Sequence, residues 1–230
     1  MAKISDIIKK AKGEVGYTEN PPNSNKTKYG KWYGMDGQPY CCIFIMWLFG
    51  DDRPFPKTAS CTTLMNFFKK NGKLKLTPMF GDLVFLNFDK NPDKSVAKHI
   101  GIVVEVHDQY VRTIEGNTSS DEKGSQDNGG VVAYKKRYLG KNICGFGRVD
   151  YSDGQQYPLL KRGSRGSDVI FLQQRLATSG YSVGKIDGIF GGNTEKAVRE
   201  FQHEAFPNDP KEWDGQVGNK TWKALLKGDK

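Results

Sequence analysis

Hydrophobic residues in the first 70 positions recur at intervals of three and four, the spacing of a helix that buries one face. These intervals predict an amphipathic helix over residues 4–15. Residues 41–48 are apolar on all sides and predict a buried helix, and residues 62–70 predict another. Residues 16–39, between the first two helices, are polar, aromatic and rich in turn-forming residues. A loop of that length in a compact domain is usually functional.

From residue 80 onward the apolar residues form short runs bounded by turn residues, which predicts strands. We expect five of them, at residues 83–88, 99–106, 110–114, 131–134 and 143–149. Helices followed by antiparallel strands are typical of an α+β domain, which the pattern places at residues 1–150. Residues 151–158 then predict a linker.

A second, smaller domain is expected over residues 159–230. Helical spacing begins near Ser167 and ends near Gly180, then returns at residues 194–201 and at residues 222–225. Three helices of this size predict a small three-helix bundle.

Part of the second domain is duplicated. The stretch DGIFGGNTEKAV, which begins at Asp187, returns as DGQVGNKTWKAL, which begins at Asp214. In each copy Asp-Gly predicts a turn, and a Thr stands where a helix is expected to begin. A doubled turn and helix without a catalytic group is typical of a compact surface-binding unit. Its candidate binding residues are Asp187, Gly188, Phe190, Asp214, Gly215 and Trp222.

Charge and cysteine content narrow the possible partners and chemistry. The 230 residues carry 35 Lys and Arg against 26 Asp and Glu, and this net charge of +9 favours nucleic acid, anionic lipid or acidic cell-wall polymer as partners. No apolar run is long enough for a membrane helix, and the N-terminus lacks the features of a secretory signal. We therefore expect synthesis in a cytosol, where the four cysteines are thiols rather than disulfides. No cysteine or histidine spacing predicts a zinc site, so we expect neither a metal nor another cofactor.

Three segments of the first domain carry residues suited to nucleophilic catalysis. Cys41 stands where a loop ends and a buried helix begins, and a helix N-terminus favours thiolate over thiol. His99 opens one strand, and Glu115 and Asn117 end the next. If these strands pair as a hairpin, the imidazole and the carboxylate or amide lie at the same end of it. That set supplies a nucleophile, a base and a group that orients the base.

The residues alone leave other interpretations open. A buried cysteine is more often an inert hydrophobic residue, and a histidine on a strand is more often structural. Among the three histidines only His99 suits the first-domain arrangement. Periodicity does not decide between Cys41 and its neighbour Cys42 as the reactive thiol.

Residues 1–150 resemble the CHAP (cysteine, histidine-dependent amidohydrolase/peptidase) family. The matching segments are residues 37–47, 81–85, 99–104 and 114–117. The resemblance implies a papain-like α+β fold and, from the register of the motif, assigns Cys41 as nucleophile. It makes His99 the general base and Glu115 the residue that orients the imidazole, with Asn117 as assistant or alternative.

The remainder of the chain resembles a second family. Residues 159–227 are similar to the three-helix type of peptidoglycan-binding domain. The matching segments are residues 159–169, Leu172-Gln173, residues 187–191, Phe201-Gln202 and Asp214-Gly215. Together the two domains resemble a phage endolysin.

The first resemblance also implies how a substrate is held. Backbone N–H groups at the helix start would meet the oxyanion, helped by Gln38. Tyr29 and Trp32 are candidate walls of the groove that receives a wall peptide, and packing is the alternative for both. Some relatives carry a calcium loop before the nucleophile, but residues 26–33 lack the carboxylates, which predicts no such site.

These observations predict an enzyme that hydrolyses amide bonds in bacterial peptidoglycan, as an N-acetylmuramoyl-L-alanine amidase or a peptide endopeptidase, and so lyses a host cell. Its expected partners are peptidoglycan and anionic wall polymers, with no nucleic acid and no membrane anchor, and we expect a monomer. Lacking a secretory signal, it would reach the wall after the membrane is permeabilised. The alternatives are a bacterial autolysin that remodels its own wall and a non-catalytic wall-binding protein. A nucleic-acid binder is supported by charge alone.

Overall fold

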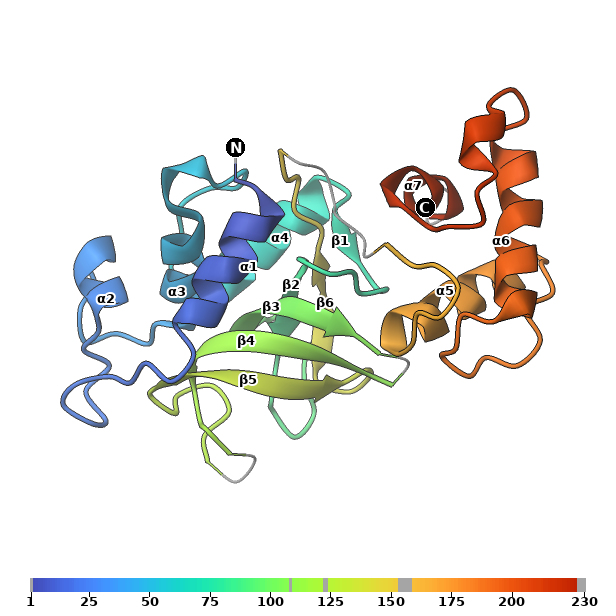
Figure 1. Cartoon of the computed structure of the whole chain (residues 1–230). Helices are drawn as coiled ribbons and strands as arrows, with labels where there is room; N and C mark the ends of the chain where they lie inside the picture. The colour runs from blue at the N-terminus through green and yellow to red at the C-terminus, as the bar shows by residue number, and fades with distance from the viewer. Residues whose placement is uncertain (1, 108, 122–123, 153–158, 227–230) are drawn as a thin grey trace. The chain divides into compact units, whose positions relative to one another are not determined.

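The computed structural model of the chain describes residues 2–107, 109–121, 124–152 and 159–226. Contacts between Cα atoms divide the chain into two units, shown in Figure 1. The first unit comprises residues 1–105 and 109–155, and the second comprises residues 156–230 together with residues 106–108. Of the predicted linker at residues 151–158, residues 153–158 lie outside the described part of the chain.

The described residues of the first unit form four α-helices, α1 (Ile4–Gly13), α2 (Lys28–Tyr33), α3 (Cys41–Phe49) and α4 (Cys61–Lys70), with a 3-10 turn at Gly50–Asp52. The apolar face of α1 that the periodicity predicted is buried. In α3 every residue except the half-buried Trp47 is buried, which agrees with the apolar run. These helices supply much of the core of the unit.

A six-stranded sheet completes the first unit. Its strands are β1 (Leu74–Lys75), β2 (Leu83–Leu86), β3 (His99–Val106), β4 (Tyr110–Thr118), β5 (Val131–Tyr138) and β6 (Ile143–Gly147). They lie in the order β1-β6-β2-β3-β4-β5, and β2 pairs with β3 and β6, and β4 with β5, in antiparallel register. Helices α1, α3 and α4 gather on one side of this sheet (Figure 1). The mixed α and β composition predicted for the chain is therefore confirmed.

The loop predicted at residues 16–39 contains a helix that the apolar pattern did not reveal. The side chain of Thr27 accepts a hydrogen bond from the N–H of Gly30 at 2.9 Å and so caps the start of α2. Gly34 ends the helix with a φ of 86°, which glycine adopts without steric cost. The helix has only six residues, so no periodic pattern could form, but the Thr and Gly at its two ends were readable signals.

Strands β4 and β5 each extend four residues beyond the predicted ends at Ile114 and Tyr134. The extension of β4 places Glu115 and Asn117 within the strand rather than after it. The β4–β5 register shifts between Glu115 and Thr118, so one residue is extra there, as in a β-bulge. The bulge lies directly beside the predicted catalytic carboxylate.

The second unit contains α5 (Ser167–Thr178), α6 (Gly192–Ala205), a 3-10 turn at Pro210–Glu212 and α7 (Asn219–Leu225). The described part of this unit has its own hydrophobic core, in which Val169, Leu172, Phe190, Val198 and Trp222 are buried. Residues 227–230 of the predicted second domain lie outside the described part of the chain. No helix among the described residues is long and apolar enough to cross a membrane.

Candidate active site

The thiol of Cys41 lies at the first residue of α3. Its side chain is almost buried, with 6% of the residue exposed, and its Sγ lies 3.6 Å from the Sγ of Cys61. The neighbouring Cys42 is fully buried and donates its S–H to the backbone oxygen of Thr58 at 3.3 Å. The two adjacent thiols therefore have different surroundings.

His99 and Glu115 lie in contact, as the hairpin argument predicted. His99 is the first residue of β3, and Glu115 lies near the end of β4. Nε2 of His99 is 2.9 Å from Oε2 of Glu115, and both side chains are fully buried. The second ring nitrogen of His99, Nδ1, is also buried and has no hydrogen-bond partner. The interaction with Cys41 raises the pKa of this imidazole.

Two glycines make these contacts possible. A Cβ atom at Gly101, two residues after His99, would stand 2.5 Å from Cγ of Glu115, so only glycine leaves room for the carboxylate. A Cβ atom at Gly116 would stand 2.7 Å from Cβ of Phe44 in α3. Gly116 therefore lets the helix that begins at Cys41 pack closely against the strand that carries Glu115.

Arg137 of β5 holds the carboxylate from the other side. Its Nε and Nη2 donate to Oε1 and Oε2 of Glu115 at 2.8 and 2.5 Å. The hydroxyl of Thr113 also donates to Oε1, at 2.5 Å. Arg137 is only 7% exposed, and a bidentate pair of this kind fixes the carboxylate in one orientation. No pattern in the sequence pointed to Arg137.

The charges of this network shift its pKa values. Burial alone would raise the pKa of Glu115, but the hydrogen bonds and charge of Arg137, with those of His99, lower it to about 2. Burial would likewise lower the pKa of His99, yet its interactions with Cys41 and Glu115 raise it to about 9. Glu115 is therefore a carboxylate and His99 an imidazolium at neutral pH.

The pKa of the Cys41 thiol is raised by the hydrogen bond with Cys61 and by burial, while the interaction with His99 lowers it. The thiol and the imidazole therefore titrate as a pair. Because Arg137 already neutralises Glu115, the uncompensated charge in the site is the imidazolium, and a Cys41 thiolate would balance it. A substrate that displaced the Cys61 thiol from Cys41 would remove the largest opposing effect.

Asn117 has a different role from the one predicted as an alternative to Glu115. Its backbone is left-handed, with a φ of 58°, and its side chain is buried. Nδ2 donates to Asn128 at 3.0 Å, and Oδ1 accepts from the N–H of Gly130 at 3.2 Å. The amide thus holds the loop between β4 and β5, and it is Glu115 that contacts the imidazole.

The three predicted substrate residues lie in different environments. Tyr29 is fully buried, its hydroxyl donates to Glu14 at 2.6 Å and its ring packs against Phe44, so its role as a groove wall is wrong and packing accounts for it. Trp32 is 42% exposed and remains available to a ligand. Gln38 is exposed, three residues before Cys41.

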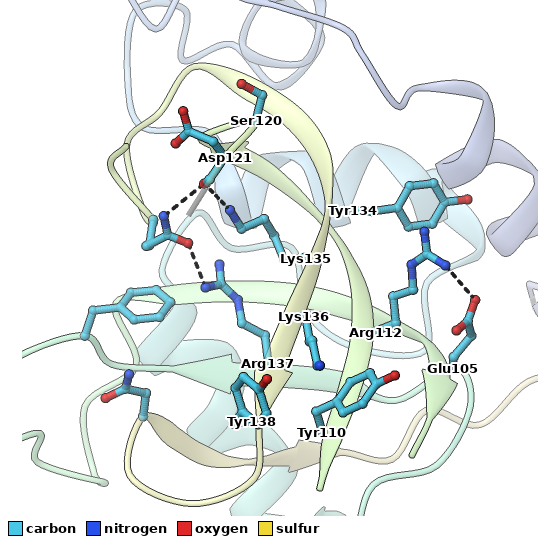
Figure 2. A pocket seen from close by; sticks show the side chains of 13 residues that line it. Glu105, Tyr110, Arg112, Ser120, Asp121, Tyr134, Lys135, Lys136, Arg137 and Tyr138 are labelled. Carbon is cyan, nitrogen blue, oxygen red and sulfur yellow. Dashed lines mark hydrogen bonds and ion pairs between the residues drawn. The ribbon is translucent and has the colours of Figure 1, made fainter. Parts of the chain in front are cut away.

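Arg137 also lines a surface pocket of about 640 Å³, whose side chains Figure 2 shows. Arg137 donates from Nη1 to Gln126 at 2.9 Å, so the guanidinium links the buried carboxylate to a surface loop. Lys135 and Arg112 also line this pocket. Arg112 lies over the ring of Tyr134, with its Cζ 4.5 Å from the ring centroid, and pairs with Glu105. Among the described residues no group of three or more His, Cys, Asp or Glu side chains is arranged to hold a metal ion.

In the second unit the duplicated stretch forms two equivalent turns, each held by a buried glutamine. Gln173 donates to Asp187 and accepts from the N–H of Gly188, at 3.1 and 2.9 Å. Gln202 makes the same two bonds, to Asp214 and from Gly215, at 3.1 and 2.9 Å. Each repeat therefore depends on a glutamine that precedes the duplicated stretch in the chain, and nothing in the sequence indicated this role.

These contacts give the duplicated residues structural roles. Gly188 and Gly215 have φ values of 73° and 71°, which explains the glycine after each aspartate. Phe190 and Trp222 are each 1% exposed and belong to the core, so they do not form a binding surface. The side chains left on the surface near the first turn include Ile189, which is 38% exposed and lines a hollow with Lys185 and Asn193.

The duplicated threonines do not begin their helices, as the sequence had suggested. Helices α6 and α7 begin two residues earlier, and Thr194 and Thr221 lie in their first turns. Each hydroxyl instead accepts a hydrogen bond from the glutamine of its repeat, at 3.0 and 3.2 Å. The preceding glycines supply the extended backbone that the helix start requires.

Comparison with known proteins finds a family match within the second unit. Residues 165–225 match the model of a family described as a putative peptidoglycan binding domain. Over 68 residues the chain is 47% identical to the spore cortex-lytic enzyme of Bacillus subtilis, an overlap of 30% of this chain and 21% of that enzyme. The chain therefore spans about a fifth of the length of this curated relative.

Two solved structures are also similar in part. The N-terminal domain of SleB is 42% identical, and the overlap covers 32% of this chain and 94% of that domain with a TM-score of 0.28. The endolysin LysIME-EF1 is 15% identical, with 66% of each chain covered and a TM-score of 0.37. TM-scores this low do not establish a shared fold.

Proposed function

We propose that this protein binds bacterial peptidoglycan through its second unit and hydrolyses amide bonds in it with Cys41 of its first unit. One observation carries the catalytic half of the proposal: a fully buried His99 contacts Glu115 through Nε2, and its other ring nitrogen, Nδ1, is buried without a hydrogen-bond partner. The match of residues 165–225 to a peptidoglycan-binding family supports the choice of substrate. The name of the relative, spore cortex-lytic enzyme, agrees with a lytic activity.

In this proposal the Cys41 thiol releases its proton to solvent, and the resulting thiolate pairs with the His99 imidazolium. Glu115, held by Arg137, fixes the ring through Nε2 and stabilises its positive charge. The thiolate attacks the amide carbonyl, and backbone N–H groups at the start of α3 stabilise the oxyanion. The imidazolium then protonates the leaving amine, and water, with His99 as base, hydrolyses the thioester.

Cys41 is preferred to Cys42 as nucleophile because of where each sulfur lies. Cys42 donates its proton to a backbone oxygen and is fully buried. Cys41 interacts with His99 and retains slight exposure. Cys41→Ser should therefore abolish hydrolysis, whereas Cys42→Ser should not.

The test uses the full chain and purified peptidoglycan. Hydrolysis should release new amino groups, and mass spectrometry of the fragments should show whether the cut lies before the first alanine, as for an amidase, or within the peptide. Cys41→Ala should release no amino groups yet sediment with the wall like the wild type. A wall-bound protein that releases no new amino groups would instead support the non-catalytic alternative.

Wall contact within the second unit is proposed to involve the hollow beside the first turn, because Lys185, Ile189 and Asn193 line it and Ile189 is exposed there. Ile189→Asp should weaken sedimentation with peptidoglycan. Leu159→Asp, at an exposed apolar residue outside this hollow, is the matched control and should bind normally.

We further propose that the protein is a phage endolysin, made in the host cytoplasm and acting on the wall once the membrane is permeabilised. Expression of the chain inside bacteria of a susceptible species should then cause lysis only after a membrane-permeabilising agent is added. Lysis without such an agent, with the protein found outside the cells, would favour the autolysin alternative.

A further inference from the structure

Cys61 lies against the proposed nucleophile but has no part in the mechanism above. It is the first residue of α4, and its Sγ is 3.6 Å from the Sγ of Cys41, 20 residues earlier in the chain. Both cysteines are free thiols, and each is 6% exposed. Two helices thus begin at cysteines whose sulfur atoms are in contact.

Hydrogen bonds hold Cys61 in this place. The hydroxyl of Thr62, the next residue, donates to the backbone oxygen of Ala97 at 2.9 Å and accepts from its N–H at 3.1 Å. The side chain of Ser60 caps α4 by accepting from the N–H of Thr63 at 3.2 Å. The start of α4 is therefore tied to the segment two residues before His99, so Cys61 keeps its position relative to the imidazole as well as to Cys41.

The 3.6 Å separation of the Cys41 and Cys61 sulfurs suits a bond between them. A disulfide has an S–S length of about 2.05 Å, so the sulfurs must approach by about 1.5 Å. Cys42 is held by its hydrogen bond to Thr58, and it cannot readily pair with its neighbour Cys41. Cys144, the fourth cysteine, donates its S–H to the backbone oxygen of Val96 at 3.5 Å.

We propose that Cys41 and Cys61 form a reversible disulfide when the protein meets a hydroperoxide, and that this bond switches the enzyme off. The inhibitory effect rests on the proposed function of Cys41, but formation of the bond does not. The Cys41 thiolate attacks the peroxide, the O–O bond breaks, and the sulfur becomes a sulfenic acid as the alcohol leaves. The sulfur of Cys61 then attacks the Cys41 sulfur, the S–O bond breaks, and water leaves with the Cys61 proton.

The overall step oxidises two thiols by two electrons and reduces one peroxide to an alcohol and water. A thiol reductant reverses it by exchange. In the oxidised state Cys41 has no free sulfur to attack an amide. The disulfide also protects Cys41 from irreversible oxidation to the sulfinic acid, because the sulfenic acid is consumed by its neighbour.

The bond is tested on the full chain without any variant. The protein is treated with equimolar hydrogen peroxide, blocked with an alkylating agent, digested without reduction and examined by fragmenting mass spectrometry. We expect a linkage between Cys41 and Cys61. Linkage through Cys42, or loss of Cys41 thiol with no linkage to Cys61, would overturn the proposal.

The switch is tested by activity on peptidoglycan. Peroxide should reduce wild-type activity to the level of Cys41→Ser, and dithiothreitol should restore it. After an excess of peroxide, Cys61→Ser, which should be active before treatment, should recover less than the wild type with dithiothreitol, because its sulfenic acid has no neighbouring thiol and is oxidised on to the sulfinic acid, whereas the matched control Cys144→Ser should behave like the wild type. Equal recovery in Cys61→Ser and wild type would contradict the switch. If Cys41→Ala still cleaved walls, the proposed function would fail while the mass-spectrometric result stood unchanged.

Discussion

Replacement of Arg137 by methionine tests whether the carboxylate at the centre of the site depends on its buried cation. Arg137→Met removes two hydrogen bonds to Glu115 and leaves a fully buried carboxylate without its bidentate partner. Removing one partner of a buried pair typically costs about 3–5 kcal/mol. The pKa of Glu115 gives a similar size, because a fall from 4.5 to about 2 on folding corresponds to about 3 kcal/mol at neutral pH.

The loss should depend on pH in a fixed direction. A carboxyl group whose folded pKa is lowered contributes stability that is present above its unfolded pKa and is lost as the pH falls through the folded pKa. In the wild type the contribution of Glu115 should therefore disappear between about pH 4.5 and pH 2. In Arg137→Met the folded pKa is higher, so the difference in unfolding free energy between the two proteins should shrink as the pH falls from 7 to 4.

All four cysteines are buried in the first unit, so their reaction with an alkylating agent can be used to measure its unfolding. Their alkylation rate in increasing urea reports unfolding of that unit alone, whatever the second unit does. Arg137→Lys, which keeps the charge but not the paired donors, should lose less than Arg137→Met. A loss below about 1 kcal/mol, or one that does not change with pH, would refute the proposed dependence of Glu115 on Arg137.

Three further predictions follow from the same contacts. Gly101→Ala should sharply reduce hydrolysis while the fold persists, because the added Cβ displaces the Glu115 side chain, and a wild-type rate on peptidoglycan would contradict this. Gln202→Leu should destabilise the second unit by about 1–3 kcal/mol, because it leaves the N–H of Gly215 unpaired, and thermal unfolding followed by tryptophan fluorescence measures this loss. Hydrolysis should fall as the pH rises through about 9, where the His99 imidazolium is lost, and a rate that kept rising to pH 10 would contradict the proposed ion pair.

The sequence located the elements that carry strong periodicity. The helices at α1, α3 and α4 and the strands that begin at His99 and Tyr110 were all expected within a few residues of their observed ends. Their apolar residues point to a shared core, so the pattern and the burial agree. Helix α2 was not predicted, because six residues are too few to show a periodic apolar pattern. Its ends are set by Thr27 and Gly34 instead.

The contact between His99 and Glu115 could be predicted because strand pairing alone brings the two ends together. The roles of Arg137 and Cys61 could not, because they depend on side-chain direction and on how α4 docks. Arg137 alternates along β5 with exposed residues and so faces inward, but no sequence rule says that an inward arginine meets a carboxylate. Asn117 and Tyr29 were misjudged for the same reason, since residue type alone does not distinguish a ligand contact from a structural hydrogen bond.

In the second unit the duplication was visible in the sequence, but the repeated residues have a structural role rather than the predicted binding role. The repeated Asp, Gly and Thr residues looked like a binding device, whereas the contacts of Gln173 and Gln202 show that they stabilise two turns. A repeat of this kind preserves the interactions that hold a fold, and the surface that meets a ligand is free to differ between copies. Ile189 and Gln216 occupy equivalent positions and differ in this way.

In the proposed mechanism Cys41 performs the chemistry while the second unit binds the wall. Incubation of wild type, Cys41→Ala and Cys42→Ala with purified peptidoglycan tests both parts at once, through the released amino groups and the sedimented protein. We expect all three proteins to sediment with the wall and only Cys41→Ala to release no amino groups. Release by Cys41→Ala at the wild-type rate would contradict this mechanism.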